Sequence, residues 1–227
     1  MTNNAIYLAT IWVIPVIVAI TFHEAAHGFV AYLLGDKTAW RLGRVTLNPA
    51  KHIDSFGTIL LPALLLFLHA PFLFGYAKPV PVNFRALRWP RLGMLLVAAA
   101  GPAMNIALAL VAALGFHFVD IFPATSAQWL AHNLKNALIL NVALAVFNLF
   151  PLPPLDGGRI LISILPRTLA APVAALEPYG LLILIGLFIV LPTLGAKLGV
   201  DLNVVSHTLA AATGTIIEAI LELTGNT

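Results

Sequence analysis

Long apolar stretches alternate along the chain with short segments that carry most of its charged residues, prolines and glycines. A helix needs about 20 apolar residues to cross the hydrocarbon core of a bilayer. Runs of this kind lie near residues 5–34, 92–118, 133–150 and 179–196. The pattern therefore predicts an all-α polytopic membrane protein, a helical bundle in which these runs are spans.

Two other segments fit a plain span less well. Residues 56–76 form an apolar run that Pro62 and Pro71 interrupt, and residues 204–223 contain two glutamates. The first segment is either a re-entrant or strand-like element or a short crossing helix, because irregular backbone is tolerated in a membrane where protein covers it. The second segment either spans the membrane or lies on its surface.

Basic residues favour the re-entrant alternative for residues 56–76. Short cytoplasmic loops are enriched in lysine and arginine, and a complete crossing would put one of the two basic groups outside. We therefore expect both loops on the cytoplasmic side and the amino terminus outside. The two groups that flank the broken run are Lys37, Arg41, Arg44 and Lys51 before it, and Lys78, Arg85, Arg88 and Arg91 after it.

Composition agrees with a membrane protein. Of the 227 residues, 60% are hydrophobic and 9% charged, whereas soluble domains are about half apolar and a quarter charged. The net charge of +3 does not indicate nucleic acid, because the basic residues lie between apolar runs and form no stripe. No repeat or linker divides the chain, so we expect one domain over residues 1–227, with a core at 5–165 and extra carboxy-terminal helices at 177–224.

The first apolar run contains the sequence HEAAH at residues 23–27. Positions i and i+4 share one face of a helix, so His23 and His27 can direct imidazole nitrogens at one ion. Ionisable groups inside a membrane segment are costly and tend to be functional. Zinc suits such a site, and because the chain has no cysteine its ligands must be nitrogen and oxygen. Glu24 is then a general base that moves a proton from the attacking water to the departing amine.

A third ligand has to come from the acidic residues elsewhere, and Asp156 stands out among them. It follows an apolar run that three prolines interrupt, and prolines end helices. Gly157 and Gly158 allow backbone conformations closed to other residues, so the carboxylate can be aimed back into the bundle. Without the HEAAH motif, a solvated turn is the simpler interpretation. The other candidates are Asp36, Asp54, Asp120, Glu177, Asp201, Glu218 and Glu222.

Three motifs follow one another on successive apolar segments: HEAAH at 23–27, AGPAMN at 100–105 and FNLFPLPPLDGG at 147–158. Together they resemble the site-2 protease family of intramembrane zinc metalloproteases, over residues 5–165. The resemblance implies a core of three spans that carry these motifs. The chain differs from larger relatives in showing no PDZ domain between its spans and no carboxy-terminal nucleotide-sensing domain.

The resemblance also implies an activity and a site. The activity is hydrolysis of peptide bonds in or near the transmembrane segments of membrane proteins, with one Zn²⁺ per chain. The zinc ligands would be His23, His27 and Asp156, with Glu24 as the base. Asn148, which matches the asparagine of an NxxP motif, would hold the substrate or stabilise the oxyanion.

Two weaker features could also contact a substrate. Asn105 lies with Gly101 on a small-residue helix face, where it serves either close packing or contact with substrate backbone. Residues 75–83 alternate proline and valine in part, so the segment is either an extended strand that pairs with an unwound substrate or a simple connector.

The expected partners are a transmembrane protein substrate and the lipid bilayer, with no nucleic acid; the sequence does not indicate an oligomeric state. We expect a multi-pass protein of the cell membrane with its active site toward the cytoplasm, because HEAAH lies near the inner end of its span. A metal transporter and an inactive, protease-like scaffold are the alternatives. A transporter needs ligands along a path, and a scaffold would be expected to lack a ligand or the base.

Overall fold

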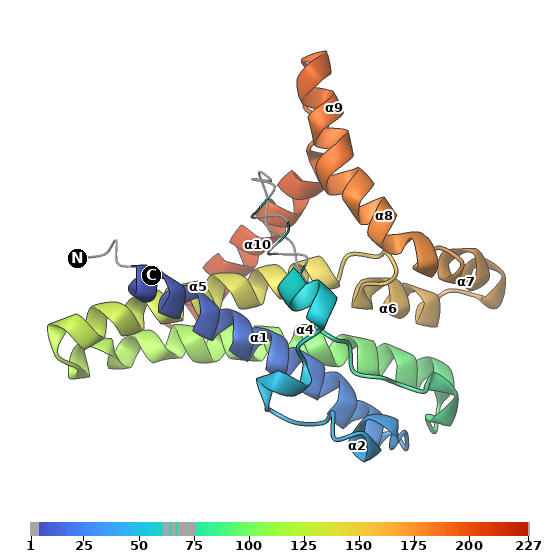
Figure 1. The fold of residues 1–227 in the computed structure, drawn as a ribbon, viewed down its shortest axis with the longest axis horizontal. Helices are drawn as coiled ribbons and strands as arrows, with labels where there is room; N and C mark the ends of the chain where they lie inside the picture. The colour runs from blue at the N-terminus through green and yellow to red at the C-terminus, as the bar shows by residue number, and fades with distance from the viewer. Residues whose placement is uncertain (1–4, 61–63, 65–66, 68–75, 227) are drawn as a thin grey trace.

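The computed structural model describes residues 5–60, 64, 67 and 76–226. Three long helices form its centre: α1 (Ala5–Leu33), α4 (Pro90–Gly115) and α5 (Ala124–Asn148). Each of the three contacts the other two, and Figure 1 shows them lying alongside one another. These helices carry HEAAH, AGPAMN and the start of the proline-rich motif, as the sequence predicts.

Small side chains allow the central helices to approach closely. Ala109, Ala112 and Ala113 of α4 pack against Leu138 and Val142 of α5 in one buried cluster. Little hydrophobic force acts between helices inside lipid, so close van der Waals packing of small residues is what holds them together. The alanines of α4 therefore contribute to the stability of the core.

The carboxy-terminal half of the chain adds further helices around this core. After α5 come α6 (Asp156–Ile164) and α7 (Arg167–Ala174), and then α8 (Gly180–Ile185), a π-helical turn (Gly186–Val190) and α9 (Leu191–Leu198). The orange α8–α9 segment projects away from the bundle in Figure 1. The last helix, α10 (Val204–Leu223), packs against α5.

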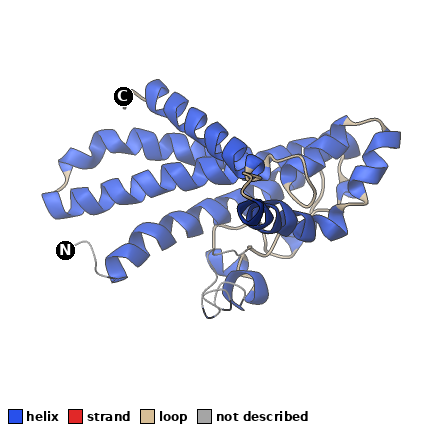
Figure 2. Cartoon of the chain, turned by 90° about the horizontal axis from the view of Figure 1, so that it is seen from above, coloured by secondary structure: helices blue, strands red, loops and turns tan. Residues whose placement is uncertain are grey.

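Five helical segments of the described chain are long and apolar enough to cross a membrane: Ala5–Leu33, Pro90–Ile121, Ala124–Asn148, Arg167–Leu198 and Val204–Leu223. The four spans expected from the apolar runs are among them, and residues 204–223 form the fifth. None of the described residues lies in a strand, and Figure 2 shows helices and loops only. The all-α polytopic fold is confirmed.

Shorter elements connect α1 to α4. They are α2 (Thr38–Arg41), the 3-10 turns Pro49–Lys51 and Phe84–Ala86, and the π-helical turn Ser55–Leu60. Residues 61–63, 65–66 and 68–75 of the broken apolar run lie outside the described residues.

The two described ends of the broken run lie side by side. The amide of Tyr76 donates to the carbonyl of Gly57 at 3.0 Å, and the amide of Lys78 donates to the carbonyl of His52 at 2.9 Å. A single crossing helix would separate its ends by about 30 Å, the thickness of the hydrocarbon core. The hydrogen bonds between these described ends agree with the re-entrant prediction, which requires the two ends to lie close together.

Candidate metal centre and active site

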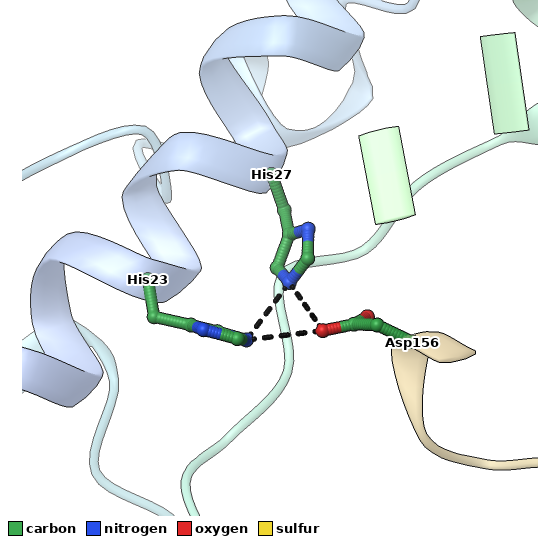
Figure 3. A group of neighbouring side chains, drawn as sticks. All are labelled: His23, His27 and Asp156. Carbon is green, nitrogen blue, oxygen red and sulfur yellow. Dashed lines mark hydrogen bonds and ion pairs between the residues drawn. The ribbon is translucent and has the colours of Figure 1, made fainter. Parts of the chain in front are cut away.

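Three side chains with metal-ligand atoms meet between α1 and α6 (Figure 3). His23 and His27 lie one turn apart on α1, and Asp156 is the first residue of α6. The Nε2 atoms of the two histidines are 3.0 Å apart. Oδ2 of Asp156 lies 3.2 Å from Nε2 of His23 and 3.3 Å from Nε2 of His27. All three residues are buried. The structure thus brings Asp156 to a histidine pair that lies more than a hundred positions earlier in the sequence.

The donor atoms of this cluster suit a cation. Nδ1 of His27 lies 2.7 Å from the carbonyl oxygen of Val97, and a carbonyl can only accept, so Nδ1 carries the hydrogen and the neutral ring keeps its lone pair on Nε2. Oδ2 of Asp156 is buried and accepts no hydrogen bond, although both histidines lie within ion-pair distance of it. Converging lone pairs in a buried site repel one another unless a cation or proton lies among them. Two nitrogens and one oxygen form a donor set that zinc accepts.

Helix α4 forms the wall behind the cluster. A Cβ atom placed on Gly101 would lie 2.4 Å from Nε2 of His27 and 2.6 Å from Nε2 of His23. Real Cβ atoms do not approach other atoms so closely, so only glycine fits at this position. The glycine of AGPAMN thus leaves room for the two histidine rings, in addition to allowing close helix packing.

A tight loop delivers Asp156 to the cluster. Helix α5 ends at Asn148, and α6 begins at Asp156 after the proline-rich segment. A Cβ atom on Gly157 would lie 2.1 Å from the carbonyl oxygen of Leu149, and one on Gly158 would lie 2.2 Å from the nitrogen of Pro153. Both glycines are helical, and neither is among the described glycines with positive φ. The expectation that they supply an unusual backbone conformation is therefore wrong; they allow α6 to approach the loop.

A cavity of about 390 Å³ lies beside the cluster. His23, Glu24 and Asn148 line it together with apolar side chains, and Leu181 and Leu184 bring α8 to its wall. Ligand sites are commonly apolar hollows with a few convergent polar groups. The remaining lining residues are Ile20, Tyr76, Ala77, Leu144, Phe147, Pro154 and Leu155.

Glu24 also contacts the segment that precedes α4. The amide of Val80 donates to Oε2 of Glu24 at 2.8 Å. The same segment is held by Arg44, whose guanidinium donates to the carbonyl of Lys78 at 2.8 Å, and by Asp36, whose Oδ2 accepts from the amide of Asn83 at 2.6 Å. Asp36 and Arg44 are buried. Side chains from the loops after α1 thus fix residues 78–83 beside the candidate base.

The two asparagines singled out in the sequence lie in different surroundings. Asn148 is half-buried, lines the cavity, and donates through Nδ2 to the carbonyl of Leu144 at 2.9 Å. Asn105 has no exposed surface, and its Oδ1 lies 2.6 Å from Nδ1 of His23. Asn141, which the sequence reasoning did not single out, contacts Asn105 in turn. An asparagine in an apolar span was the available signal for it.

A bundle of helices long enough to span a membrane, with a buried His–His–Asp cluster beside a glutamate, is the arrangement expected of a membrane metalloprotease. Comparisons agree with this class: residues 116–192 match the model of peptidase family M50. The chain is 42% identical over 184 residues to "Putative zinc metalloprotease YwhC" of Bacillus subtilis, an alignment that covers 78% of this chain and 79% of that protein. The chain belongs to peptidase family M50, and the resemblance to site-2 proteases is confirmed.

Two other relatives carry similar names. "Putative zinc metalloprotease Rip2" of Mycobacterium tuberculosis is 31% identical over 202 residues, which cover 86% of this chain and 75% of that protein. "Zinc metalloprotease MJ0392" of Methanocaldococcus jannaschii is 26% identical over 165 residues, covering 73% of this chain and 37% of that protein. No solved structure matches the chain significantly. The protein is a zinc metalloprotease of the site-2 type, and its cofactor is zinc.

Proposed function

We propose that this protease cleaves peptide bonds in or near the transmembrane segments of other membrane proteins. One observation carries the proposal: His23, Glu24 and Asn148 line one cavity beside the His–His–Asp cluster, among helices that can cross a membrane. In this proposal His23, His27 and Asp156 hold the zinc ion. A transmembrane substrate would reach the site from the bilayer.

Glu24 is the general base in this mechanism. A zinc ion held by His23, His27 and Asp156 would act as a Lewis acid that makes water more acidic and polarises the scissile carbonyl. Oε2 of Glu24 accepts a hydrogen bond from the amide of Val80. We therefore assign the proton taken from the attacking water to Oε1. Glu24 takes that proton as the water oxygen bonds to the carbonyl carbon, and it returns a proton to the amine nitrogen as the carbon–nitrogen bond breaks.

Asn148 is the candidate oxyanion donor. Its Nδ2 carries two hydrogens, and the carbonyl of Leu144 engages one of them. The other hydrogen can form a hydrogen bond to the substrate carbonyl oxygen and stabilise the negative charge that develops there, because Asn148 lines the same cavity as Glu24. Asn105 is completely buried, so we assign it no contact with substrate.

The segment at residues 76–83 is the candidate partner for substrate backbone. A helix that enters the site must unwind, and unpaired backbone groups are costly in lipid. The segment lines the cavity at Tyr76 and Ala77, and Arg44 and Asp36 hold it in place. A substrate strand could add to such an edge through main-chain hydrogen bonds.

We further propose that the site opens toward the cytoplasm of the cell. The two basic loops lie together, since the amide of Arg88 donates to the carbonyl of Leu34 at 2.8 Å and that of Lys78 to His52. Loops rich in lysine and arginine favour the cytoplasmic side. The end of α1 that carries His27 leads into these loops, so the cluster lies in the inner half of the membrane.

The test is Glu24→Gln in purified protein reconstituted with a membrane-embedded reporter substrate. Glutamine keeps an acceptor for the Val80 amide but cannot take a proton, so reporter cleavage should fall about 100- to 10,000-fold while zinc content is unchanged. Glu177→Gln is the matched control, because Glu177 is paired with Arg159 and does not line the cavity. Equal cleavage by Glu24→Gln and wild type at equal zinc would refute the mechanism.

The same vesicles separate the alternatives. A metal transporter would carry zinc across the bilayer, and Glu24→Gln would leave that flux nearly unchanged. A scaffold would bind the reporter without cleaving it in wild-type form. Zinc flux in the wild-type protein would favour the transporter over proteolysis, and reporter binding without product would favour the scaffold.

A further inference from the structure

A buried series of hydrogen bonds links His23 of α1 to Asn141 of α5 through Asn105 of α4. Oδ1 of Asn105 lies 2.6 Å from Nδ1 of His23, and Nδ2 of Asn105 lies 2.8 Å from Oδ1 of Asn141. Asn105 is 0% exposed and Asn141 is 2% exposed. Nothing in the proposed mechanism uses these two amides, although one of them touches a candidate zinc ligand.

Two backbone carbonyls set the direction of every hydrogen bond in this series. Nδ2 of Asn141 donates to the carbonyl of Ala137 at 2.8 Å, so Oδ1 of Asn141 faces Asn105. Nδ2 of Asn105 donates to that oxygen and to the carbonyl of Ala19 at 3.3 Å. Because carbonyl oxygens only accept, neither amide can be turned around without losing its partners. Oδ1 of Asn105 must therefore face His23 as an acceptor.

An acceptor at Nδ1 decides which nitrogen of His23 carries the hydrogen. Nδ1 has to donate to Asn105, so the neutral ring keeps its lone pair on Nε2, the atom that faces His27 and Asp156. The carbonyl of Val97 acts on His27 in the same way. Both histidines are thus held in the form that a metal ion requires, one by backbone and one by a side chain.

We propose that Asn105 is a positioning residue for the zinc ligand His23 and that Asn141 holds Asn105 in the required orientation. Partners of this kind typically change metal affinity 10- to 100-fold when they are removed. The proposal rests on the assignment of His23 as a zinc ligand. Asn105 and Asn141 would act through His23 and would not touch the substrate.

Neighbouring asparagines show what a purely structural role looks like. Asn136 of α5 is also buried and donates to the carbonyl of Ile11 of α1 at 2.8 Å. Asn133 donates to the carbonyl of Trp129 within its own helix. Both side chains bind backbone carbonyls, and neither contacts His23 in the described structure. Asn136 is therefore a matched control for Asn141 on the same helix.

The experiment measures zinc affinity of the full-length protein by competition with a chromophoric chelator. Asn105→Leu, which has a similar size but no acceptor, should weaken zinc binding about 10- to 100-fold. Asn105→Asp keeps an acceptor for Nδ1 of His23 but loses the donor to Asn141 and Ala19, so it should retain more of the affinity than Asn105→Leu. Asn141→Leu should weaken binding to a smaller extent, and Asn136→Leu should bind zinc as wild type does.

Two further measurements distinguish positioning from helix packing. Packing alone predicts that Asn105→Leu and Asn136→Leu lower the thermal stability of the metal-free protein without a selective loss of zinc. Positioning predicts that the visible absorption bands of bound Co²⁺ shift in Asn105→Leu and Asn141→Leu but stay unchanged in Asn136→Leu. If Asn105→Leu does not fold, Asn141→Leu decides, because Asn141 does not contact the ligands.

Wild-type affinity and an unchanged Co²⁺ spectrum in Asn105→Leu, or in Asn141→Leu should the first variant not fold, would overturn the inference. So would an equal loss of affinity in Asn105→Leu and Asn105→Asp. A failure of the proposed function has different signatures: His23→Ala would keep full zinc content if His23 is not a ligand, and Glu24→Gln would cleave the reporter as wild type does if the protease mechanism is wrong. The two failures are therefore distinguishable in one set of proteins.

Discussion

The Cβ position of Gly101 lies 2.4 Å from Nε2 of His27. The glycine on α4 and the histidine on α1 therefore occupy adjoining space that no larger residue can share. Gly101→Ala would push a methyl group into both histidines of the cluster. We expect this variant to lose most of its zinc and its protease activity, as measured by metal analysis of the purified protein and by reporter cleavage.

The control for that variant is Gly214→Ala. Gly214 lies in α10, and a Cβ atom placed on it would meet nothing within 4 Å. Alanine is also the better helix former, so Gly214→Ala should keep its zinc and its activity. Full zinc content in Gly101→Ala would contradict the packing of α4 against the histidines.

Asp156→Ala should lose most of its zinc, because it removes the only carboxylate in the His–His–Asp cluster found among the described residues. Elemental analysis after purification measures this directly. Asp201→Ala is the control, since Asp201 is exposed and pairs with His207 on the surface. If Asp156→Ala retained zinc and activity, the third ligand would have to be another acidic residue.

Asn148→Leu should lower kcat and leave zinc content unchanged. Loss of one oxyanion donor costs about 100- to 1,000-fold in rate, whereas a residue that only holds substrate would chiefly raise KM. Asn133→Leu is a close control, because Asn133 and Asn148 each donate to the carbonyl four residues earlier on α5. An unchanged kcat in Asn148→Leu would remove Asn148 from the proposed mechanism.

The basic loops should be labelled from the cytoplasmic side only. The chain has no cysteine of its own, so single cysteines can be introduced at the exposed positions Lys51, Arg85 and Lys197. A membrane-impermeant maleimide should reach Lys51→Cys and Arg85→Cys only after permeabilisation. It should reach Lys197→Cys in intact cells, because Lys197 lies at the far end of the candidate span Arg167–Leu198, away from the expected cytoplasmic end at Arg167. Labelling of the first two from opposite sides would contradict the re-entrant path.

Much of the fold could be predicted from local sequence. The length of an apolar run and the helical spacing of His23 and His27 are each properties of one segment. The structure confirms the spans that the apolar runs indicate. Residues 204–223 were ambiguous because two glutamates lower their apolar character, and length with overall hydropathy still makes α10 a candidate span.

Other features depended on contacts between distant segments. The spacing of HEAAH predicts a histidine pair, but it does not show that α4 would need glycine at position 101 or that Asn105 would face His23. The reason offered for Gly157 was wrong because its backbone is helical, and the close carbonyl of Leu149 is what excludes a side chain.

The sequence by itself determined the class of protein: apolar runs long enough to span, and two histidines at helical spacing, suited to binding a metal, with a glutamate beside them. Only the tertiary structure showed that Asp156, which the sequence favours among the acidic residues, lies beside both histidines, that Asn105 faces His23, and which backbone amide meets Glu24. Helical periodicity is set by neighbours along the chain. The approach of α4, α6 and residues 78–83 to α1 is instead set by the packing of small residues and by buried hydrogen bonds between segments far apart in sequence.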